Sequence, residues 1–218
     1  TRRSSDLIEE LSKKITNDFK IIKSNEENQV NTNINHEVLI LQEEDKQKAL
    51  QYFIKKQEYK SIIVFVNTKD DTDEVLWFVK MMWITCDNIH RNRSQNARQR
   101  AIQAIKSWEI KALIATDIAS RWIDIDNLSL VINYSLPKDS EVYIHRIWRT
   151  ARAGNSWFAI SFCTQKELPR LESIENLIWG KIKINNDTKY LDEIVVKWEY
   201  LWNFWDKKVP KKKKRYYK

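Results

Sequence analysis

The sequence predicts an α/β fold, a three-layer sandwich in which a mainly parallel sheet lies between two layers of helices. Apolar runs such as residues 61–66 and 112–115 are continuous rather than alternating, as is typical of strands buried on both faces of a parallel sheet. Stretches with apolar residues at helical spacing follow these runs, so strands and helices alternate along the chain. This alternation favours parallel strands connected by helices on both faces of one sheet.

The N-terminal part of the chain predicts two helices and two short strands around a polar linker. Ser4 or Ser5 can cap a helix that runs to about residue 17, with apolar residues on one face. Residues 24–35 are polar and rich in asparagine, which is typical of a linker. The strands are expected at residues 19–23 and 37–41, and the second helix at residues 45–56.

The rest of the chain repeats the strand–helix unit. Apolar runs predict strands at residues 61–66, 84–89, 112–115, 128–133 and 157–163, and a short one at 181–184. Helical spacing predicts helices at residues 72–82, 94–107 and 165–178, and one that starts at residue 139 or 140. Beyond about residue 189 the chain is irregular, and it ends in a basic run at residues 211–215.

Composition limits the class of protein. With 218 residues, 42% of them hydrophobic, the chain can form one domain with a sizeable core plus extensions. No apolar run approaches the roughly 20 residues that a membrane helix needs, so no membrane partner is expected. Cys86 and Cys163 cannot form a disulfide framework, which favours a reducing, cytoplasmic compartment. The histidines and cysteines show no metal-ligand spacing, so no metal site is expected, and His90 is interpreted as a polar residue beside the sheet.

Polar residues follow three of the predicted strands at their carboxyl ends. Asn67 and Thr68 follow the first buried strand, residues 90–98 follow the second, and Thr116 and Asp117 follow the third. Ligands of parallel sheets bind beyond the carboxyl ends of the strands, so these residues are expected to form one composite surface. A net charge of +8 and a pI of about 9.3 suit a nucleic-acid partner for that surface.

The most informative run is residues 145–154, where three arginines are spaced three residues apart behind a histidine. Arginine presents a planar fork of donors that matches two phosphate oxygens. Several such forks aimed at one point stabilise the charge that develops in phosphoryl transfer. A solvated basic surface is the alternative that composition alone favours, and Arg146 could equally brace the fold through a salt bridge. The order of the neighbouring segments favours phosphate binding.

Four segments resemble, in order, motifs of the second RecA-like domain of DEAD-box RNA helicases, over about residues 61–184. They are residues 64–68 (motif IV), 95–98 (the QxxR element), 115–125 (motif V) and 145–152 (motif VI, HRxGRxxR). One such match would be weak, but four in the right order and spacing make a specific resemblance. It implies the RecA-like, P-loop NTPase-like fold of a helicase C-terminal domain. Residues 89–95 also resemble the bacterial RhlE-like subgroup.

The resemblance implies roles at a nucleotide site. Arg149 and Arg152 would reach the γ-phosphate of ATP, with Arg152 as the arginine finger. Asp124 would contact the ribose, and His145 would bridge to an acidic motif of the partner domain. From the residues alone, Asp124 could instead be a turn carboxylate paired with Arg121.

The resemblance also implies an RNA surface made of Thr68, Gln95, Arg98, Thr116, Asp117 and Trp122. Thr68, Arg98 and Thr116 would hold the sugar–phosphate backbone, through contacts that fix register without reading sequence. Such contacts predict binding that depends on salt and tolerates changes of RNA sequence. From the residues alone, Thr116 and Asp117 could simply cap a turn.

The chain lacks a GxxxxGK[ST] loop and a DEAD sequence, which this family has on its first domain. The resemblance therefore implies half of a site for ATP with Mg²⁺, whose metal ligands are expected on that first domain. Thr1 could end the first domain's SAT motif, which would make the chain a fragment of a longer helicase; a stand-alone protein is the alternative. The expected parts are a first-domain remnant (1–24), a linker (25–35), the second RecA-like domain (36–188) and a basic tail (189–218).

We therefore expect the C-terminal half of an ATP-dependent RNA helicase, an ATP hydrolase acting on RNA that is inactive without its first domain. This half would supply the arginine finger and part of the RNA-binding surface. Its partners would be RNA and the first RecA-like domain of the same polypeptide, in a cytoplasmic monomer. The alternative is a non-catalytic RNA-binding module, which would not need an arginine finger. A DNA translocase of the wider superfamily fits less well, because motif VI is of the DEAD-box type.

The glycine content is abnormal, since the chain has 2 glycines and 10 tryptophans where average usage predicts about 15 glycines. Six tryptophans fall where the family or related sequences usually have glycine: Trp83, Trp108, Trp122, Trp148, Trp157 and Trp179. One hypothesis is that UGA codons, which some bacteria decode as glycine, have been translated as tryptophan. The alternative is true tryptophan in core or surface positions.

Overall fold

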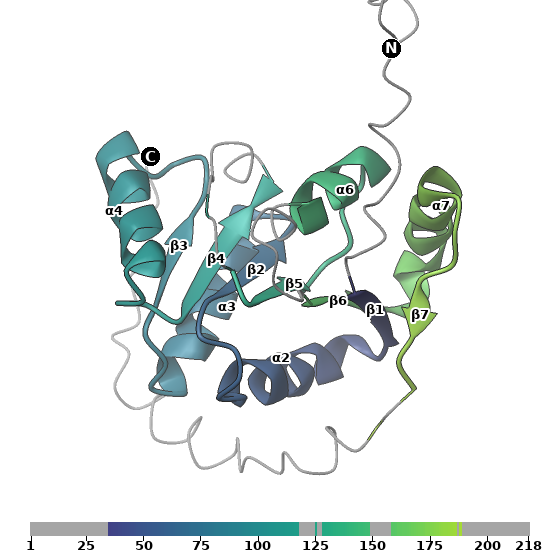
Figure 1. The fold of residues 1–218 in the computed structure, drawn as a ribbon, viewed down its shortest axis with the longest axis horizontal. Helices are drawn as coiled ribbons and strands as arrows, with labels where there is room; N and C mark the ends of the chain where they lie inside the picture. The colour runs from purple at the N-terminus through teal and green to yellow at the C-terminus, as the bar shows by residue number, and fades with distance from the viewer. Residues whose placement is uncertain (1–34, 118–124, 126–127, 149–157, 187, 189–218) are drawn as a thin grey trace, which may run out of the picture.

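The computed structural model describes residues 35–117, 125, 128–148, 158–186 and 188 (Figure 1). Seven strands form one sheet in the order β3-β4-β2-β5-β6-β1-β7, and every adjacent pair is parallel. The strands are β1 (Asn35–Ile40), β2 (Ile62–Val66), β3 (Cys86–Ile89), β4 (Ala112–Thr116), β5 (Leu130–Asn133), β6 (Phe158–Cys163) and β7 (Lys183–Ile184). The helices are η2 (Glu43–Asp45), α2 (Lys46–Lys55), α3 (Lys69–Met81), α4 (Gln95–Lys106), α6 (Ser140–Trp148), η3 (Gln165–Glu167) and α7 (Leu168–Ile178). The predicted α/β class is confirmed.

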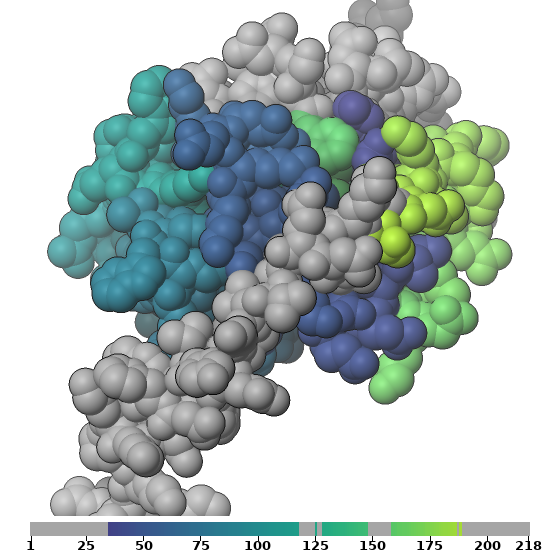
Figure 2. Space-filling model, turned by 90° about the horizontal axis from the view of Figure 1, so that it is seen from below, coloured from purple at the N-terminus to yellow at the C-terminus, as the bar shows by residue number. Residues whose placement is uncertain are grey.

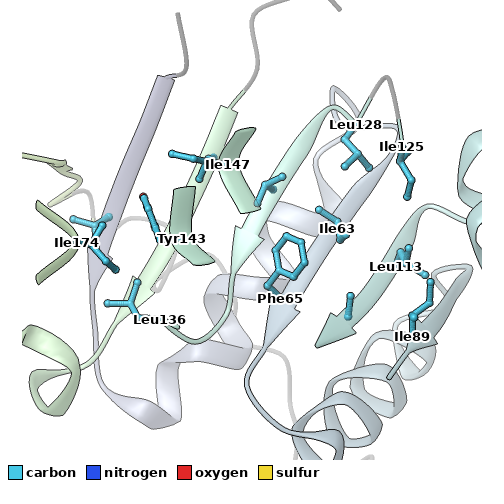
Figure 3. Close-up of a cluster of buried hydrophobic side chains, with 14 of the residues drawn as sticks. Ile63, Phe65, Ile89, Leu113, Ile125, Leu128, Leu136, Tyr143, Ile147 and Ile174 are labelled. Carbon is cyan, nitrogen blue, oxygen red and sulfur yellow. The ribbon is translucent and has the colours of Figure 1, made fainter. Parts of the chain in front are cut away.

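Helices cover both faces of the sheet because the side chains of each strand alternate between two hydrophobic clusters. Ile63 of β2 belongs to a cluster with α4, α6 and α7, whereas its neighbours Ile62 and Val64 belong to a cluster with α2 and α3. Figure 3 shows the first cluster, in which Tyr143 of α6 and Ile174 of α7 lie against the sheet. The three-layer sandwich predicted from the continuous apolar runs is therefore present.

The two edges of the sheet are short strands, β3 at one side and β7 at the other. Figures 1 and 2 show α4 (teal) and α7 (green to yellow) at these opposite ends of the molecule. In the part of the chain that the structure describes, no helix is long and apolar enough to span a membrane.

The predicted elements agree with the structure to within one or two residues, with one exception. Helix α3 begins at Lys69 instead of residue 72, because its first turn is polar and gives no apolar periodicity. The predicted helices at 45–56 and 165–178 each begin with a short 3-10 turn, η2 or η3. Asn35, at the end of the predicted linker, already belongs to β1. The predictions for residues 1–34 and 189–218 lie outside the described residues.

Candidate functional site

The carboxyl ends of four neighbouring strands meet at one edge of the sheet, called the rim below. Val66 of β2 pairs with Thr116 of β4, so Asn67 and Asp117 leave the sheet side by side. Strands β3 and β5 flank these two and end within one residue of the same level. The sequence prediction that the polar residues after these strands share one edge is therefore correct.

Arg146 of α6 lies at the centre of the rim and is fully buried, with 0% of its surface exposed. Its Nε donates a hydrogen bond to Oδ1 of Asp117 at 2.6 Å. Its Nη1 donates to Oδ1 of Asn133 at 3.1 Å and to the carbonyl oxygen of Ser135 at 2.8 Å. Its Nη2 donates to Oδ1 of Asn67 at 3.4 Å. One guanidinium thus joins the ends of β2, β4 and β5 to α6.

The surroundings of Arg146 indicate a structural brace. Burial lowers the pKa of Arg146, while the carboxylate of Asp117 opposes that shift. The guanidinium also lies 5.0 Å from the centre of the Phe65 ring, on its face. Because protein atoms already occupy its donors, the structure supports the salt-bridge interpretation of Arg146 over contact with nucleotide. Asp117 forms an ion pair with this guanidinium through its Oδ1, which is a structural role other than the expected turn cap. The role of Asp117 in RNA binding stays a prediction.

A chain of hydrogen bonds continues from the rim into the core. Nδ2 of Asn133 donates to Oγ of Ser161 at 3.0 Å, and that hydroxyl donates to the phenol oxygen of Tyr143 at 3.4 Å. The phenol oxygen lies 3.4 Å from Nδ1 of His36. Burial raises the pKa of Tyr143 to about 12 and lowers the pKa of His36, so both side chains favour their neutral forms. The sequence analysis missed this series of hydrogen bonds, although polar residues inside apolar strands could have indicated it.

His145 lies next to Arg146 on α6 and is exposed. Successive residues of an α-helix point about 100° apart, so the burial of Arg146 turns His145 outward at the rim. His145 is therefore positioned to meet a ligand or a partner. Four predicted site residues lie outside the described part of the chain: Trp122, Asp124, Arg149 and Arg152.

Thr68 caps helix α3 at the rim. Its Oγ1 accepts a hydrogen bond from the backbone N of Asp71 at 3.1 Å, and Oδ2 of Asp71 accepts one from the backbone N of Thr68 at 3.2 Å. This is a capping box. A hydroxyl has one donor and two acceptor sites, so the exposed Thr68 keeps its O–H donor for the oxygen of a ligand.

Gln95 and Arg98 lie in the first turns of α4, which Ser94 caps by accepting a hydrogen bond from the backbone N of Ala97 at 3.3 Å. Gln95 is exposed, and Nη2 of Arg98 donates to the carbonyl oxygen of Arg91 at 2.8 Å. Nε of Arg98 is buried and has no hydrogen-bond partner among the described residues. The side chain of Arg98 as a whole is only partly buried, and the guanidinium offers several donors that match phosphate oxygens.

Thr116 ends β4 and His90 directly follows the neighbouring strand β3, and both are only 7% exposed. Nδ1 of His90 accepts a hydrogen bond from the backbone N of Asn92 at 3.3 Å, and burial lowers the pKa of His90. The interpretation of His90 as a satisfied polar residue is therefore confirmed. Thr116 presents little surface, so a contact with RNA would involve its backbone and the edge of its side chain.

A buried ion pair that the sequence did not reveal supports the loop before α6. Nζ of Lys46 lies 3.2 Å from Oε2 of Glu167. Oε1 of Glu167 accepts a hydrogen bond from the backbone N of Leu136, and Oε2 accepts two from Thr164. The carboxylate thus joins α2 and η3 to the segment that leads into α6. In a sequence, these two charges cannot be told from ordinary surface charges.

The described residues contain no group of three or more His, Cys, Asp or Glu side chains that could hold a metal ion. A cleft of about 900 Å³ lies between α4 and the edge strand β3, with Lys80, Arg93 and Arg100 among its lining residues. Asn96 and Ala97 of the QxxR element line this cleft, whereas Gln95 and Arg98 do not.

Comparison with known proteins agrees with these motifs. Residues 45–154 match the family described as the helicase conserved C-terminal domain. Over 176 residues, the chain is 37% identical to the ATP-dependent RNA helicase DbpA of Bacillus subtilis. The aligned region covers 81% of this chain and 37% of DbpA. The chain thus spans less than half the length of this curated relative.

Solved structures identify the half to which the chain corresponds. It covers 97% of the C-terminal domain of the DEAD-box protein Dbp5, with 75% of this chain aligned, 30% identity and a TM-score of 0.66. It covers 52% of S. cerevisiae Dbp5 bound to RNA and ADP BeF3, with 88% of this chain aligned, 27% identity and a TM-score of 0.72. The RhlE-like subgroup stays a prediction. The chain belongs to the helicase conserved C-terminal domain family, as a C-terminal RecA-like domain of the DEAD-box type.

Proposed function

We propose that this chain is the C-terminal half of an ATP-dependent RNA helicase, and that its rim faces ATP and RNA bound against a first RecA-like domain. The observation that supports this most is the buried guanidinium of Arg146. It fixes the start of motif VI against the strands that end in motifs IV and V. Residues that are far apart in the sequence are therefore held together at one surface, with His145 facing outward.

ATP with Mg²⁺ is the proposed cofactor. Exposed His145 and the two arginines that follow α6 in the sequence fit a polyphosphate, because their donors match phosphate oxygens. Arg149 and Arg152 would neutralise the charge on the γ-phosphate, and Asp124 would bind the ribose hydroxyls. When bound, ATP supplies the phosphoanhydride bond whose hydrolysis resets the helicase. The carboxylates for Mg²⁺ would come from the first domain, since the described residues offer no metal cluster.

RNA is the proposed substrate of the same rim. The O–H of exposed Thr68 and the guanidinium of partly buried Arg98 are donors suited to phosphate oxygens. S. cerevisiae Dbp5, which shares this fold, has been solved bound to RNA. The remaining proposed RNA-binding residues are Gln95, Thr116, Asp117 and Trp122.

Fluorescence anisotropy with a labelled single-stranded RNA tests the RNA surface. Arg98→Ala should weaken binding and lower the slope of log Kd against log salt by about 0.7, the value for one lost phosphate contact on a single strand. Lys106→Ala, at the other end of α4, is the matched control and should leave the slope nearly unchanged. Equal affinity and slope for Arg98→Ala and the unaltered chain would argue against this surface.

The ATPase role requires the full-length gene product that we propose. There, Arg152→Ala should lower the RNA-stimulated kcat by about 10³- to 10⁵-fold, as expected for an arginine finger. Arg98→Ala should act mainly on RNA affinity. RNA binding without any ATPase in the full-length protein would instead support the non-catalytic RNA-binding module.

We also propose that the protein is a monomer in a reducing, cytoplasmic compartment. The free thiols of Cys86 and Cys163 support the reducing compartment. Size-exclusion chromatography with light scattering measures the oligomeric state directly, and a dimer mass would contradict the proposal.

A further inference from the structure

Three tryptophans have a left-handed backbone. The φ angles are 59° at Trp83, 60° at Trp108 and 55° at Trp179, and no other non-glycine residue in the described part of the chain has a positive φ. In this region the Cβ of an L-residue crowds the backbone, and a bulky residue there is a genuine outlier. Glycine, which has no Cβ, adopts it without strain.

Each of the three residues lies within two positions of the last residue of a helix. Trp83 N donates to the carbonyl oxygen of Lys80 at 3.0 Å after α3, and Trp108 N donates to that of Ile105 at 3.3 Å after α4. After α7, the residue next to Trp179 completes the same kind of cap, since Gly180 N bonds to the carbonyl oxygen of Glu175 at 3.2 Å. These bonds are typical of helix C-caps that contain a left-handed residue, for which glycine is the usual choice.

The indoles gain little that could offset the strain. Trp83 is 97% exposed, Trp179 is 90% exposed and Trp108 is 64% exposed. Nζ of Lys60 lies over the ring of Trp108, 5.9 Å from the ring centre, which is a weak cation–π contact at an exposed site. A large apolar side chain is thus placed in solvent three times, each time on a backbone that glycine prefers. Neither the core nor the surface alternative for true tryptophan accounts for this placement.

Other residues of the same types behave normally. Trp77 lies inside α3, is 47% exposed and has an ordinary helical backbone. Gly180, the glycine in the described part of the chain, has an ordinary φ, whereas Trp179 before it is left-handed. With only 2 glycines in 218 residues, the chain lacks glycine where its own backbone needs it.

We propose that positions 83, 108 and 179 are glycine in the protein as its own cell makes it, and that their codons are UGA read by a glycine tRNA. This proposal rests on backbone geometry and exposure, and it is independent of the helicase function. It restores the residue that all three caps require, and it removes three exposed indoles from the surface.

The gene and the native protein test the proposal directly. UGA is expected at codons 83, 108 and 179, and peptides from protein purified from the source cells should have the mass of glycine at these positions. UGG at these three codons, or peptide masses with tryptophan, would overturn the proposal.

Stability measurements test the backbone argument without the source cells. Trp83→Gly, Trp108→Gly and Trp179→Gly are compared with alanine at the same positions, because alanine also removes the indole but keeps the Cβ. Each glycine variant should have a folding equilibrium constant about two- to fivefold higher than its alanine variant. This net gain is the strain that glycine relieves at a left-handed position, reduced by the entropy that glycine loses on folding. Glycine variants that are no more stable than alanine variants would contradict the proposal.

Trp77→Gly and Trp77→Ala, in the helical part of α3, form the matched control pair. There the order should reverse, with glycine about two- to fivefold less favourable than alanine, because an interior helical position disfavours glycine. A preference for glycine at position 77 as large as at the three caps would show that removal of indole, not backbone geometry, causes the effect.

Discussion

Arg146 shows how much one buried side chain can determine at a binding surface. It donates to Asp117, Asn133, Ser135 and Asn67, which lie on three different strand ends. A charge removed from water is tolerated only when it is paired and hydrogen-bonded, as it is here. The same residue that fixes α6 therefore determines where His145 points.

Substitution Arg146→Met should destabilise the domain strongly. It removes the buried guanidinium and, with it, the hydrogen bonds that Asp117, Asn133 and Asn67 accept from it. Breaking a buried pair costs about 3–5 kcal/mol, which urea denaturation followed by circular dichroism measures. Lys48→Met, which breaks the partly exposed pair with Asp45, should cost less than about 1 kcal/mol. Similar losses for both variants would mean that Arg146 is not a brace.

The thiol of Cys163 should be unreactive in the folded protein. It is buried, and burial raises its pKa to about 11, with Glu167 acting in the same direction. At pH 7 the thiol is therefore protonated, and the reactive thiolate becomes abundant only as the pH approaches that value. Labelling with a thiol reagent should be slow at pH 7 and become fast when urea unfolds the chain. Fast labelling of Cys163 under native conditions, read by peptide mapping, would contradict its burial.

At the residue scale, the sequence predicted motif positions better than side-chain roles. It left open whether Arg146 braces the fold or binds nucleotide, because helical spacing alone does not say which arginine is buried. In the sequence, Asn133 is the ordinary end of one strand and Ser161 lies in the middle of another. Only the folded sheet brings Nδ2 of Asn133 to 3.0 Å from Oγ of Ser161. The partners of a buried polar group come from distant segments, so local patterns cannot reveal them.

At the level of elements, Thr68 combines a structural and a proposed binding role. Thr68→Ala should destabilise the domain by about 0.5–2 kcal/mol, because the N-cap of α3 is lost. It should also weaken RNA binding, since the O–H donor is removed with the cap. Thermal unfolding and RNA anisotropy measure the two effects separately. Thr68→Ser keeps the hydroxyl and should preserve both, so a serine variant as impaired as alanine would rule out the hydroxyl as the cause.

The ends of elements were harder to predict than their existence. The helix at α3 was expected to begin at residue 72, but the capping box of Thr68 and Asp71 starts it at Lys69. Apolar periodicity cannot detect a first turn made of Lys69, Asp70 and Asp71, whereas a search for caps can. At the other end, the left-handed backbone at Trp83 follows from the helix and strand that it connects, against the preference of the residue itself.

For the whole molecule, the chain would supply one half of the proposed ATP site. The isolated chain should therefore show no RNA-stimulated ATP hydrolysis above background in a coupled assay. It should still bind RNA, more weakly as salt rises, because phosphate contacts dominate. RNA-stimulated turnover by this chain alone would contradict the proposal that a first domain supplies the phosphate loop and the metal ligands.

The fold was predictable because its strands are continuous apolar runs separated by helical periodicity. Strand order was a different matter. No local pattern of residues 35–40 shows that this first strand lies between β6 and β7. Parallel pairing is set by how the helices pack on the two faces, which is a property of the whole chain.

This position of β1 has a consequence for synthesis on the ribosome. Its two neighbours, β6 and β7, span residues 158–184 and are the last strands of the sheet to be translated. While the intervening segments emerge, Asn35–Ile40 has neither of its native hydrogen-bonding partners, and its second half, Val38–Ile40, exposes three apolar residues. The nascent domain is therefore most exposed to misassociation just before its C-terminal segment leaves the exit tunnel, and a chaperone that shields β1 would act in that interval.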